Sequence, residues 1–324
     1  MGEFDLIARY FTRPVRRAAL GVGDDCALLA PAPGMQLAIS SDMLVAGRHF
    51  FADVDPALLG HKALAVNLSD LAACGARPLA FTLALALPSA DAAWLEGFSR
   101  GLLALADAHG CELIGGDTTQ GPLNICITVF GEVPTGQALL RSGARPGDDL
   151  YVSGTLGDAR LALEALLGHV QLPAGLLASA RQRLEQPTPR VALGQALRGM
   201  ASSALDLSDG LLGDLGHLLR ASGVGARVER SITMQLIAAS AYPESPQGLL
   251  SPELIDQCTL AGGDDYELAF TAPPALRSAV AAAAQASATP VTRIGVIEAT
   301  PGLRLVDAQG RALPGHYAAF DHFA

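Results

Sequence analysis

The chain has 324 residues, 50% of them hydrophobic and 17% charged, and its formal net charge is −10 at pH 7. A composition this apolar can bury a large core and excludes global disorder, while the acidic charge argues against binding to nucleic acids or anionic membranes. No run of about 18 apolar residues is present, so no transmembrane helix is expected. At roughly 150 residues per domain, the length predicts two domains.

The first half of the chain alternates predicted helices and strands. In chain order these are a short amphipathic helix at 4–11, a basic stretch, a short buried strand at 37–40, a helix at 56–73, a strand at 81–87, a helix at 92–109 and a strand at 124–133. Gly75 and Pro78 are stop signals for the helix at 56–73. The helix at 92–109 places Trp94 and Phe98 on one side at helical spacing, which is typical of a core-facing stripe.

A domain boundary is predicted near Arg145-Pro146-Gly147, which gives domains of residues 1–145 and 146–324. The second half then shows strands at 149–153, 203–205 and 267–271, and helices at 157–168, 190–200, 211–221 and 274–286. This irregular order favours an α+β fold with mixed sheets and helices over a regular doubly wound sheet.

Several common site types are absent. Lys62 is the single lysine among 22 basic residues, and it stands in Gly-His-Lys-Ala, so no Walker A phosphate loop is present. The 5 cysteines include no CxxC pair, which disfavours a zinc site or a disulfide framework and predicts reduced thiols in a cytoplasmic protein. No basic segment followed by an apolar one opens the chain, so no signal peptide is expected.

Aspartates recur beside glycine or serine at the predicted ends of apolar elements: Asp24, Asp25, Asp42, Asp70, Asp117, Asp206, Asp209, Asp264 and Asp265. Carboxylates that gather in space need a positive charge between them, and oxygen-only ligands suit Mg²⁺, Mn²⁺ or Ca²⁺. Neighbouring glycines let the backbone N–H groups approach an anion. The pattern therefore predicts a site for a metal-bridged polyphosphate.

Each motif also has a purely local interpretation. A single Asp after Gly is typical of a turn, and Ser208-Asp209-Gly210 could cap the helix that begins at 211. Asn67 and Asp70 differ, because they are on one face of a helix that is apolar on nearly all sides, where an unpartnered carboxylate would be unfavourable. His49 could contact substrate or lie on a surface loop, and Arg141 could bind phosphate or be solvated.

These motifs resemble those of bacterial thiamine-monophosphate kinase, and the resemblance spans nearly the whole chain. The matching segments are Gly2–Phe11, Gly21–Ala27, Ser40–Asp42, Leu44–Phe50, Lys62–Gly75, Ile114–Thr119, Arg141–Ala144, Asp206–Leu211, Gly262–Leu268 and Phe320–Phe323. Each motif is weak alone, but their order is specific.

The resemblance implies an aminoimidazole-ribonucleotide-synthetase-like fold of two α+β domains. The N-terminal domain would bind ATP and metal and form a homodimer, and the C-terminal domain would complete the active site. The implied activity is transfer of the γ-phosphoryl group from ATP, the co-substrate, to thiamine monophosphate, assisted by several Mg²⁺ ions and with no phosphoenzyme.

Site residues follow from the matching positions. Metal ligands would be Asp25, Ser40, Ser41, Asp42, Asp70, Asp117, Asp206 and Asp209, among which Asp70, Asp117 and Asp209 are the expected catalytic residues. ATP contacts would be Gly116, Asp117, Arg141 and Ser208, and substrate contacts His49, Asp264 and Tyr317. Relatives often have Glu at the position of Asp264 and an aromatic such as Trp near Tyr317.

The residues leave two competing hypotheses. Related selenophosphate synthetases need an N-terminal cysteine and the hydrogenase-maturation relatives a C-terminal one, and this chain has neither in those segments. A non-catalytic nucleotide-binding protein on the same scaffold should have lost some of the metal aspartates, whereas all of them are present here.

Overall fold

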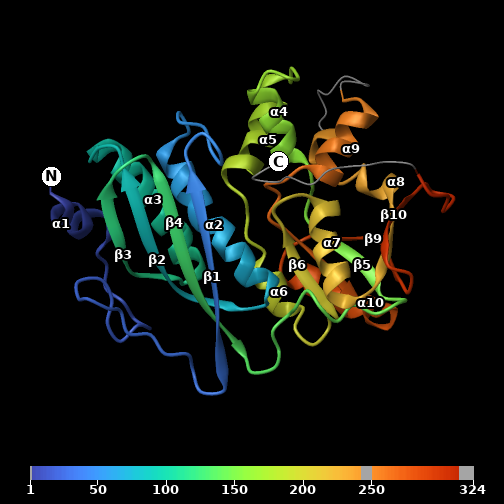
Figure 1. Cartoon of the computed structure of the whole chain (residues 1–324), viewed down its shortest axis with the longest axis horizontal. Helices are drawn as coiled ribbons and strands as arrows, with labels where there is room; N and C mark the ends of the chain where they lie inside the picture. Colours follow the sequence, from blue (N-terminus) through green and yellow to red (C-terminus); the bar gives the residue numbers. More distant parts are fainter. Residues whose placement is uncertain (1, 242–249, 314–324) are drawn as a thin grey trace. The chain divides into compact units, whose positions relative to one another are not determined.

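The computed structural model describes residues 2–241 and 250–313 and divides into two compact units (Figure 1). The first unit comprises residues 1–71 and 76–137, and the second comprises residues 72–75 and 138–324. Within the described residues, no helix is both long enough and apolar enough to cross a membrane.

A four-stranded mixed sheet forms the centre of the first unit. Its order is β1-β4-β2-β3, with β1 at Met35–Val45, β2 at Arg77–Leu87, β3 at Glu112–Gln120 and β4 at Asn124–Pro134. The β1–β4 and β4–β2 pairs are antiparallel and the β2–β3 pair is parallel. Both edge strands, β1 and β3, carry predicted site residues.

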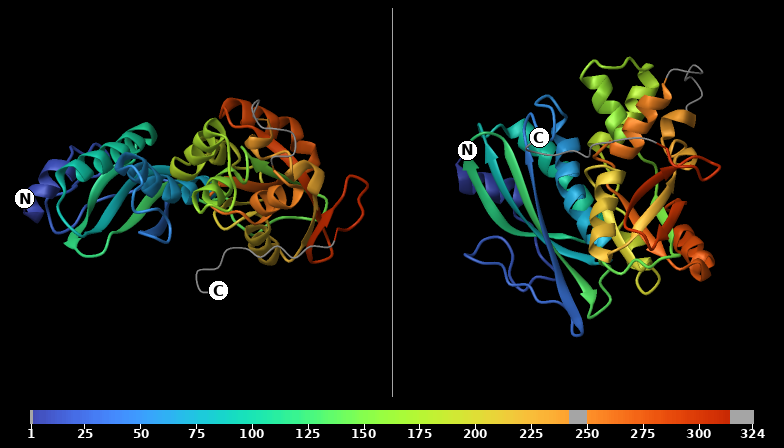
Figure 2. Two further views of the ribbon diagram at one scale, coloured as in Figure 1. Left: turned by 90° about the horizontal axis from the view of Figure 1, so that it is seen from above. Right: turned by 45° about the vertical axis from the view of Figure 1, so that its right-hand side comes forward.

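Helices α2 (Pro56–Ala73) and α3 (Ala92–His109) cover one face of this sheet (Figures 1 and 2). Both helices have the predicted bounds. In α3, the Asp91 side chain caps the first turn and Gly110 takes the left-handed conformation after the last one. A Cβ at Gly101 would lie 1.9 Å from the Ala57 carbonyl oxygen, so the two helices touch through their backbones. Most of α2 is buried, in agreement with its largely apolar sequence.

The predicted buried strand at 37–40 is longer and more exposed than expected. It belongs to β1, in which Leu37 is 39% and Ile39 59% exposed. The expectation of burial was wrong, because β1 is an edge strand whose odd-numbered positions face away from α2. The result is an apolar surface on this strand, to which Met43 also contributes.

The N-terminal segment is attached to β3. The predicted helix at 4–11 is a short α1 (Glu3–Leu6) followed by a π-helical turn (Ile7–Phe11). After it, the Glu112 carboxylate accepts backbone N–H bonds from Arg16, Arg17 and Ala18 at 2.8–3.3 Å. Burial acts to raise the pKa of Glu112, but these bonds lower it overall. The charged form therefore fixes the chain just before the Asp24–Asp25 turn.

The second unit contains a six-stranded sheet of order β10-β7-β9-β5-β8-β6. The strands are β5 (Asp149–Ser153), β6 (Ser203–Leu207), β7 (Gly225–Glu229), β8 (Glu267–Ala272), β9 (Val291–Glu298) and β10 (Gly302–Val306). Only β10 and β7 run parallel among the neighbouring pairs of this sheet. The two mixed sheets with their helices confirm the predicted α+β class.

Helices of the second unit are α4 (Asp158–Leu166), α5 (Ala174–Glu185), α6 (Val191–Ala196), α7 (Leu211–Ser222), α8 (Arg230–Thr233), α9 (Pro252–Ala261) and α10 (Arg277–Ala286), with 3-10 turns at Ala238–Ala241 and Pro274–Leu276. Leu211, Leu215 and Leu218 of α7 pack into the core with the leucines of β6. This packing fixes the β6–α7 turn, which holds the second group of predicted site residues.

Candidate functional site

The contact between β1 and α2 brings four predicted polar residues together. The Ser40 hydroxyl donates to Asp70 Oδ2 at 2.5 Å, and the Asp42 backbone N–H donates to Asn67 Oδ1 at 3.1 Å. Asn67 and Asp70 face the same strand, as their spacing predicts. The buried Asn67 side chain also donates to the Ala63 carbonyl at 3.0 Å, so its orientation is fixed from both ends.

Ser41 and His49 lie near this contact with other partners. The Ser41 hydroxyl donates to the Ile127 carbonyl at 3.1 Å and lies 3.0 Å from Thr128 Oγ1 on β4. His49 Nδ1 accepts the Val45 backbone N–H at 2.9 Å, so in the neutral ring the proton is assigned to Nε2. That bond fixes the ring against the end of β1.

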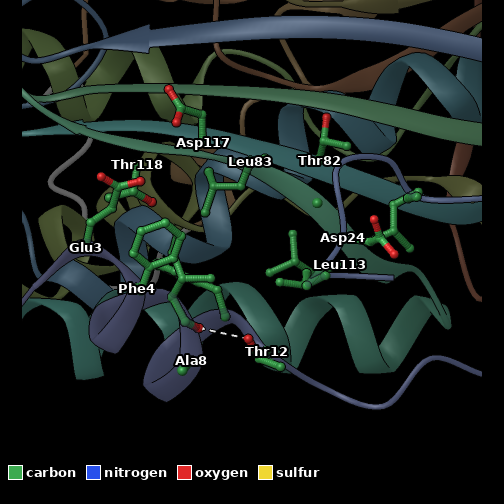
Figure 3. Close-up of a pocket in the computed structure, with 18 of the residues that line it drawn as sticks. Glu3, Phe4, Ala8, Thr12, Asp24, Thr82, Leu83, Leu113, Asp117 and Thr118 are labelled. Carbon is green, nitrogen blue, oxygen red and sulfur yellow. Dashed lines mark hydrogen bonds between the residues drawn. The ribbon is translucent and has the colours of Figure 1, made fainter. Parts of the chain in front are cut away.

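A cavity of about 830 Å³ opens between the N-terminal segment and β2 and β3 (Figure 3). Its apolar wall includes Phe4, Leu83 and Leu113, and its polar rim includes Asp24, Asp25 and Asp117. All three aspartates are exposed to solvent. The cavity therefore joins an apolar wall to an acidic rim.

Gly116 is required by the backbone of this cavity. Its φ is +147°, and a Cβ there would lie 1.8 Å from the Leu83 carbonyl oxygen on the neighbouring strand. No side chain can be accommodated without moving β2 or β3. Glycine thus lets β3 run close to β2 and places Asp117 at the cavity rim.

The β6–α7 turn gathers the second group of predicted residues. Asp206 is buried at the end of β6, and Ser208 and Asp209 follow it as half-buried residues. The loop before β8 packs on this turn, because the Asp264 N–H donates to the Ser208 carbonyl at 2.9 Å. Asp264 has φ +66°, an unusual conformation for a residue other than glycine. The two Gly-Asp-rich motifs of the second half therefore meet.

Asp214 on α7 holds the same turn from the helix side, and the sequence pattern did not single it out. Its Oδ2 accepts the backbone N–H groups of both Ser208 and Asp209 at 3.0 Å. Burial raises the pKa of Asp214 to about 6, and the nearby Arg141 guanidinium acts to lower it. An acidic residue five positions after Asp209, inside the predicted helix, was the available signal. The alternative that Ser208-Asp209-Gly210 only caps the helix is not supported by a side-chain cap, since Gly210 occupies the N-cap position of α7.

Glu267 was also not predicted. It is fully buried on β8, where it pairs with Arg183 at 2.6 Å and with Arg190 at 2.5 Å and accepts the Ser153 hydroxyl at 2.5 Å. This network connects α5, α6, β5 and β8 and supports the loop that precedes Glu267. Its function is to hold the framework of the second unit together.

The predicted residues fall into three groups. Asp25, Gly116 and Asp117 line the cavity, Ser40, Asp42 and Asp70 meet at β1–α2, and Arg141, Asp206, Ser208, Asp209 and Asp264 surround or adjoin the β6–α7 turn. Tyr317 lies outside the described residues. Within residues 2–241 and 250–313, no three His, Cys, Asp or Glu side chains are arranged so that they could hold a metal ion.

Comparison with known proteins gives matches along the whole chain. The family models for the N-terminal and C-terminal domains of AIR synthase related proteins match residues 23–133 and 145–308. The thiamine-monophosphate kinase of Salmonella typhimurium is 48% identical over 329 aligned positions, covering 100% of this chain and 98% of that protein.

Solved structures agree with these sequence matches. The crystal structure of thiamine-monophosphate kinase from Stenotrophomonas maltophilia K279a is 45% identical and has a TM-score of 0.83, with 96% of each chain covered. A structure described as AaThiL complexed with AMPPCP and TMP is 28% identical with a TM-score of 0.73, covering 91% of this chain and 89% of that one. The fold, the motif order and these matches together show that the chain belongs to the bacterial thiamine-monophosphate kinase family of AIR synthase related proteins.

Proposed function

We propose that this protein transfers the γ-phosphoryl group of ATP to thiamine monophosphate, producing thiamine diphosphate and ADP. The observation that carries the proposal is the set of oxygen ligands that α2 fixes on β1, where Asp70 accepts the Ser40 hydroxyl and Asn67 fixes the backbone of Asp42. Hard oxygen donors on a buried framework are what phosphoryl transfer with divalent cations requires.

The donor chemistry fits Mg²⁺, because every assigned ligand offers carboxylate or hydroxyl oxygen and none offers sulfur or imidazole. We assign metal binding to Asp25, Ser40, Ser41, Asp42, Asp70, Asp117, Asp206 and Asp209. When bound, Mg²⁺ would neutralise part of the charge on the phosphate groups. The exposed carboxylates of Asp25 and Asp117 would reach such ions without first breaking a buried ion pair.

For the nucleotide we assign Gly116, Asp117, Arg141 and Ser208, and for thiamine monophosphate His49, Asp264 and Tyr317. Gly116 lets a phosphate approach the backbone of β3, and Arg141 can place its guanidinium on phosphate oxygens. His49 presents Nε2 as a donor because Nδ1 is occupied by Val45.

The reaction needs no general base on the protein. The acceptor is a phosphate monoester whose second pKa is about 6, so it is largely ionised at neutral pH. The protein therefore has to hold two anionic groups in line; Mg²⁺ ions held by the acidic residues, together with Arg141, would supply the balancing positive charge. Transfer is direct, and an acid-stable phosphorylated protein on the pathway would contradict it.

We also propose that residues 1–145 bind ATP and metal and form a homodimer, while residues 146–324 complete the active site. The exposed apolar side chains of Leu37, Ile39 and Met43 on β1 support a protein interface there. Sedimentation velocity should give a dimer for the wild type and a monomer for Ile39→Asp. A wild-type monomer at micromolar concentration would contradict the dimer.

Incubation of the purified protein with ATP, Mg²⁺ and thiamine monophosphate tests the activity. Formation of thiamine diphosphate at the same rate as ADP supports the kinase, whereas nucleotide binding without turnover supports a non-catalytic binding protein. Omission of Mg²⁺, or its removal with a chelator, should stop the reaction.

Two variants test the assigned carboxylates. Asp70→Asn and Asp117→Asn should fold normally but lose at least about 10²-fold in kcat, as expected when a charge-stabilising group is removed. Asp107→Asn is the matched control, because Asp107 is an exposed residue of the same unit that pairs with Arg13. It should keep near wild-type turnover. Full activity of Asp70→Asn or Asp117→Asn would refute that assignment.

A further inference from the structure

We propose that Asp214 is a positioning residue, which holds the Ser208–Asp209 turn in the conformation that presents these two residues to the nucleotide and its metal ions. The proposal rests on the function proposed above, in which Ser208 contacts ATP and Asp209 binds metal. Asp214 itself touches neither ligand in this assignment and acts through the turn.

The geometry is that of a clamp on the turn. One carboxylate oxygen, Asp214 Oδ2, accepts the N–H groups of Ser208 and Asp209, each at 3.0 Å. Two N–H groups that point to one oxygen leave the turn little freedom. On its other side the Ser208 carbonyl accepts the Asp264 N–H at 2.9 Å. The turn backbone is therefore held through donors and an acceptor, while the Ser208 and Asp209 side chains remain half-buried.

Close packing prevents the turn from finding an alternative conformation at low cost. A Cβ at Gly210 would lie 2.8 Å from the Ala261 carbonyl carbon, and one at Gly263 would lie 2.6 Å from the Ser208 carbonyl oxygen. Only glycine permits these approaches. With both flanking backbones in contact with it, the turn depends on the Asp214 carboxylate to satisfy its two N–H groups.

Helix capping alone does not explain why a buried carboxylate occupies the position of Asp214. The residue lies in the first turn of α7, is only 8% exposed, and reaches back past the N-cap at Gly210 to the turn before it. A Ser or Asn at the N-cap would stabilise the helix without burying a carboxylate. The same carboxylate thus holds the backbones of two assigned residues, Ser208 and Asp209.

Asp158 provides a matched control. It is also a buried aspartate of the second unit, 3% exposed, and it accepts two backbone N–H groups, from Ala238 at 3.2 Å and from Ala239 at 3.1 Å. Those residues are not part of the proposed site. Substitution of Asp214 or of Asp158 by Leu removes the carboxylate acceptor at similar side-chain size, whereas substitution by Asn retains one carbonyl oxygen.

The experiment measures the affinity for a non-hydrolysable ATP analogue with Mg²⁺ and the unfolding temperature of each variant. Asp214→Leu should weaken the affinity at least about 10-fold and Asp214→Asn about 2- to 5-fold, while Asp158→Leu should lower the unfolding temperature with less than a 2-fold change in affinity. Wild-type affinity in Asp214→Leu would overturn the proposal. If that variant does not fold, wild-type affinity in Asp214→Asn would overturn it.

Amide hydrogen exchange without ligand separates this proposal from the proposed function. The Ser208 and Asp209 amides should exchange at least about 3-fold faster in Asp214→Asn, whereas the last two turns of α7 should be unchanged. A wild-type protein that makes no thiamine diphosphate would refute the kinase and leave this measurement valid. Unchanged exchange at Ser208 and Asp209 would refute the clamp whatever the activity.

Discussion

Asn67 on α2 accepts the backbone N–H of Asp42 on β1 at 3.1 Å. The other side of β1 pairs with β4, so this edge-strand N–H has no strand to bond to and a helix side chain replaces it. Asn67 thereby holds the backbone of Asp42, an assigned metal ligand, against α2.

Asn67→Leu should destabilise the protein by about 1–3 kcal/mol, because it removes the acceptor from the Asp42 N–H at a site where Asn67 is 1% exposed. Chemical denaturation measures the loss. Ser99→Ala is the control, since the buried Ser99 hydroxyl donates to the Glu96 carbonyl of its own helix and has no other hydrogen-bond partner among residues 2–241 and 250–313. It should cost less than about 1 kcal/mol. Equal losses of unfolding free energy in the two variants would show that the Asn67–Asp42 hydrogen bond adds no more stability than the Ser99–Glu96 bond.

Gly116→Ala should cost about 3 kcal/mol or more, since the new Cβ would meet the Leu83 carbonyl oxygen and the backbone has φ +147°. Gly23→Ala separates strain from collision, because Gly23 has φ +122° but nothing within 4 Å of an added Cβ. That variant should cost only about 1–2 kcal/mol. Both free energies of unfolding come from denaturant titration, and a Gly23→Ala loss as large as that of Gly116→Ala would contradict the role of the close strand approach.

The cysteines should differ sharply in reactivity. Burial raises the pKa of Cys111 and of Cys258 to about 12, whereas Cys26 is exposed. At pH 8 only about one in 10⁴ of the buried thiols is ionised, so a thiol reagent should modify Cys26 first and reach the buried pair only after unfolding. Peptide mass spectrometry identifies the sites, and Cys26→Ser should remove the fast phase. Rapid labelling of Cys111 or Cys258 in the native protein would contradict this order.

Asp265 should make stability depend on pH. One of its oxygens accepts the Gly157 N–H at 2.8 Å, and Oδ2 has no hydrogen-bond partner within residues 2–241 and 250–313. Burial raises the pKa of this carboxyl well above its ordinary value; the charges of Asp158 and Glu267 also raise it, and Arg183 opposes them. The folded state therefore holds the proton more tightly than the unfolded state.

The raised pKa of Asp265 stabilises the folded state at low pH and not at high pH. The contribution of Asp265 is complete below the unfolded pKa of about 4 and is lost as pH rises toward the folded pKa, with a slope of up to about 1.4 kcal/mol per pH unit. The Asn side chain of Asp265→Asn cannot titrate. Above pH 4, the free energy of unfolding of this variant should therefore rise relative to that of the wild type by up to about 1.4 kcal/mol per pH unit. Denaturation at several pH values measures the difference. A difference independent of pH would mean that Asp265 is ionised in the folded protein.

The sequence determined the elements whose ends carry local signals. Helix α2 stops before Gly75, α3 lies between the Asp91 cap and Gly110, and β5 follows a Pro-Gly turn, because caps and turn residues act within a few positions. Asn67 and Asp70 on one helix face could also be predicted from periodicity alone. The ordered acidic motifs identified the family.

Tertiary structure decided which residues meet and which face water. The apolar sequence around Leu37 and Ile39 predicts a buried strand, but both side chains are exposed because β1 is an edge strand. The position of a strand in its sheet is decided by strand pairing. Helix α5 and strands β7, β9 and β10 lack strong local signals and take their form from packing. Asp214 belongs to the turn before it only because α7 lies against β6, and Asp42 meets Asn67 only because α2 lies against β1. Hydrogen bonds between such distant segments depend on the folded path of the backbone, which no local pattern encodes.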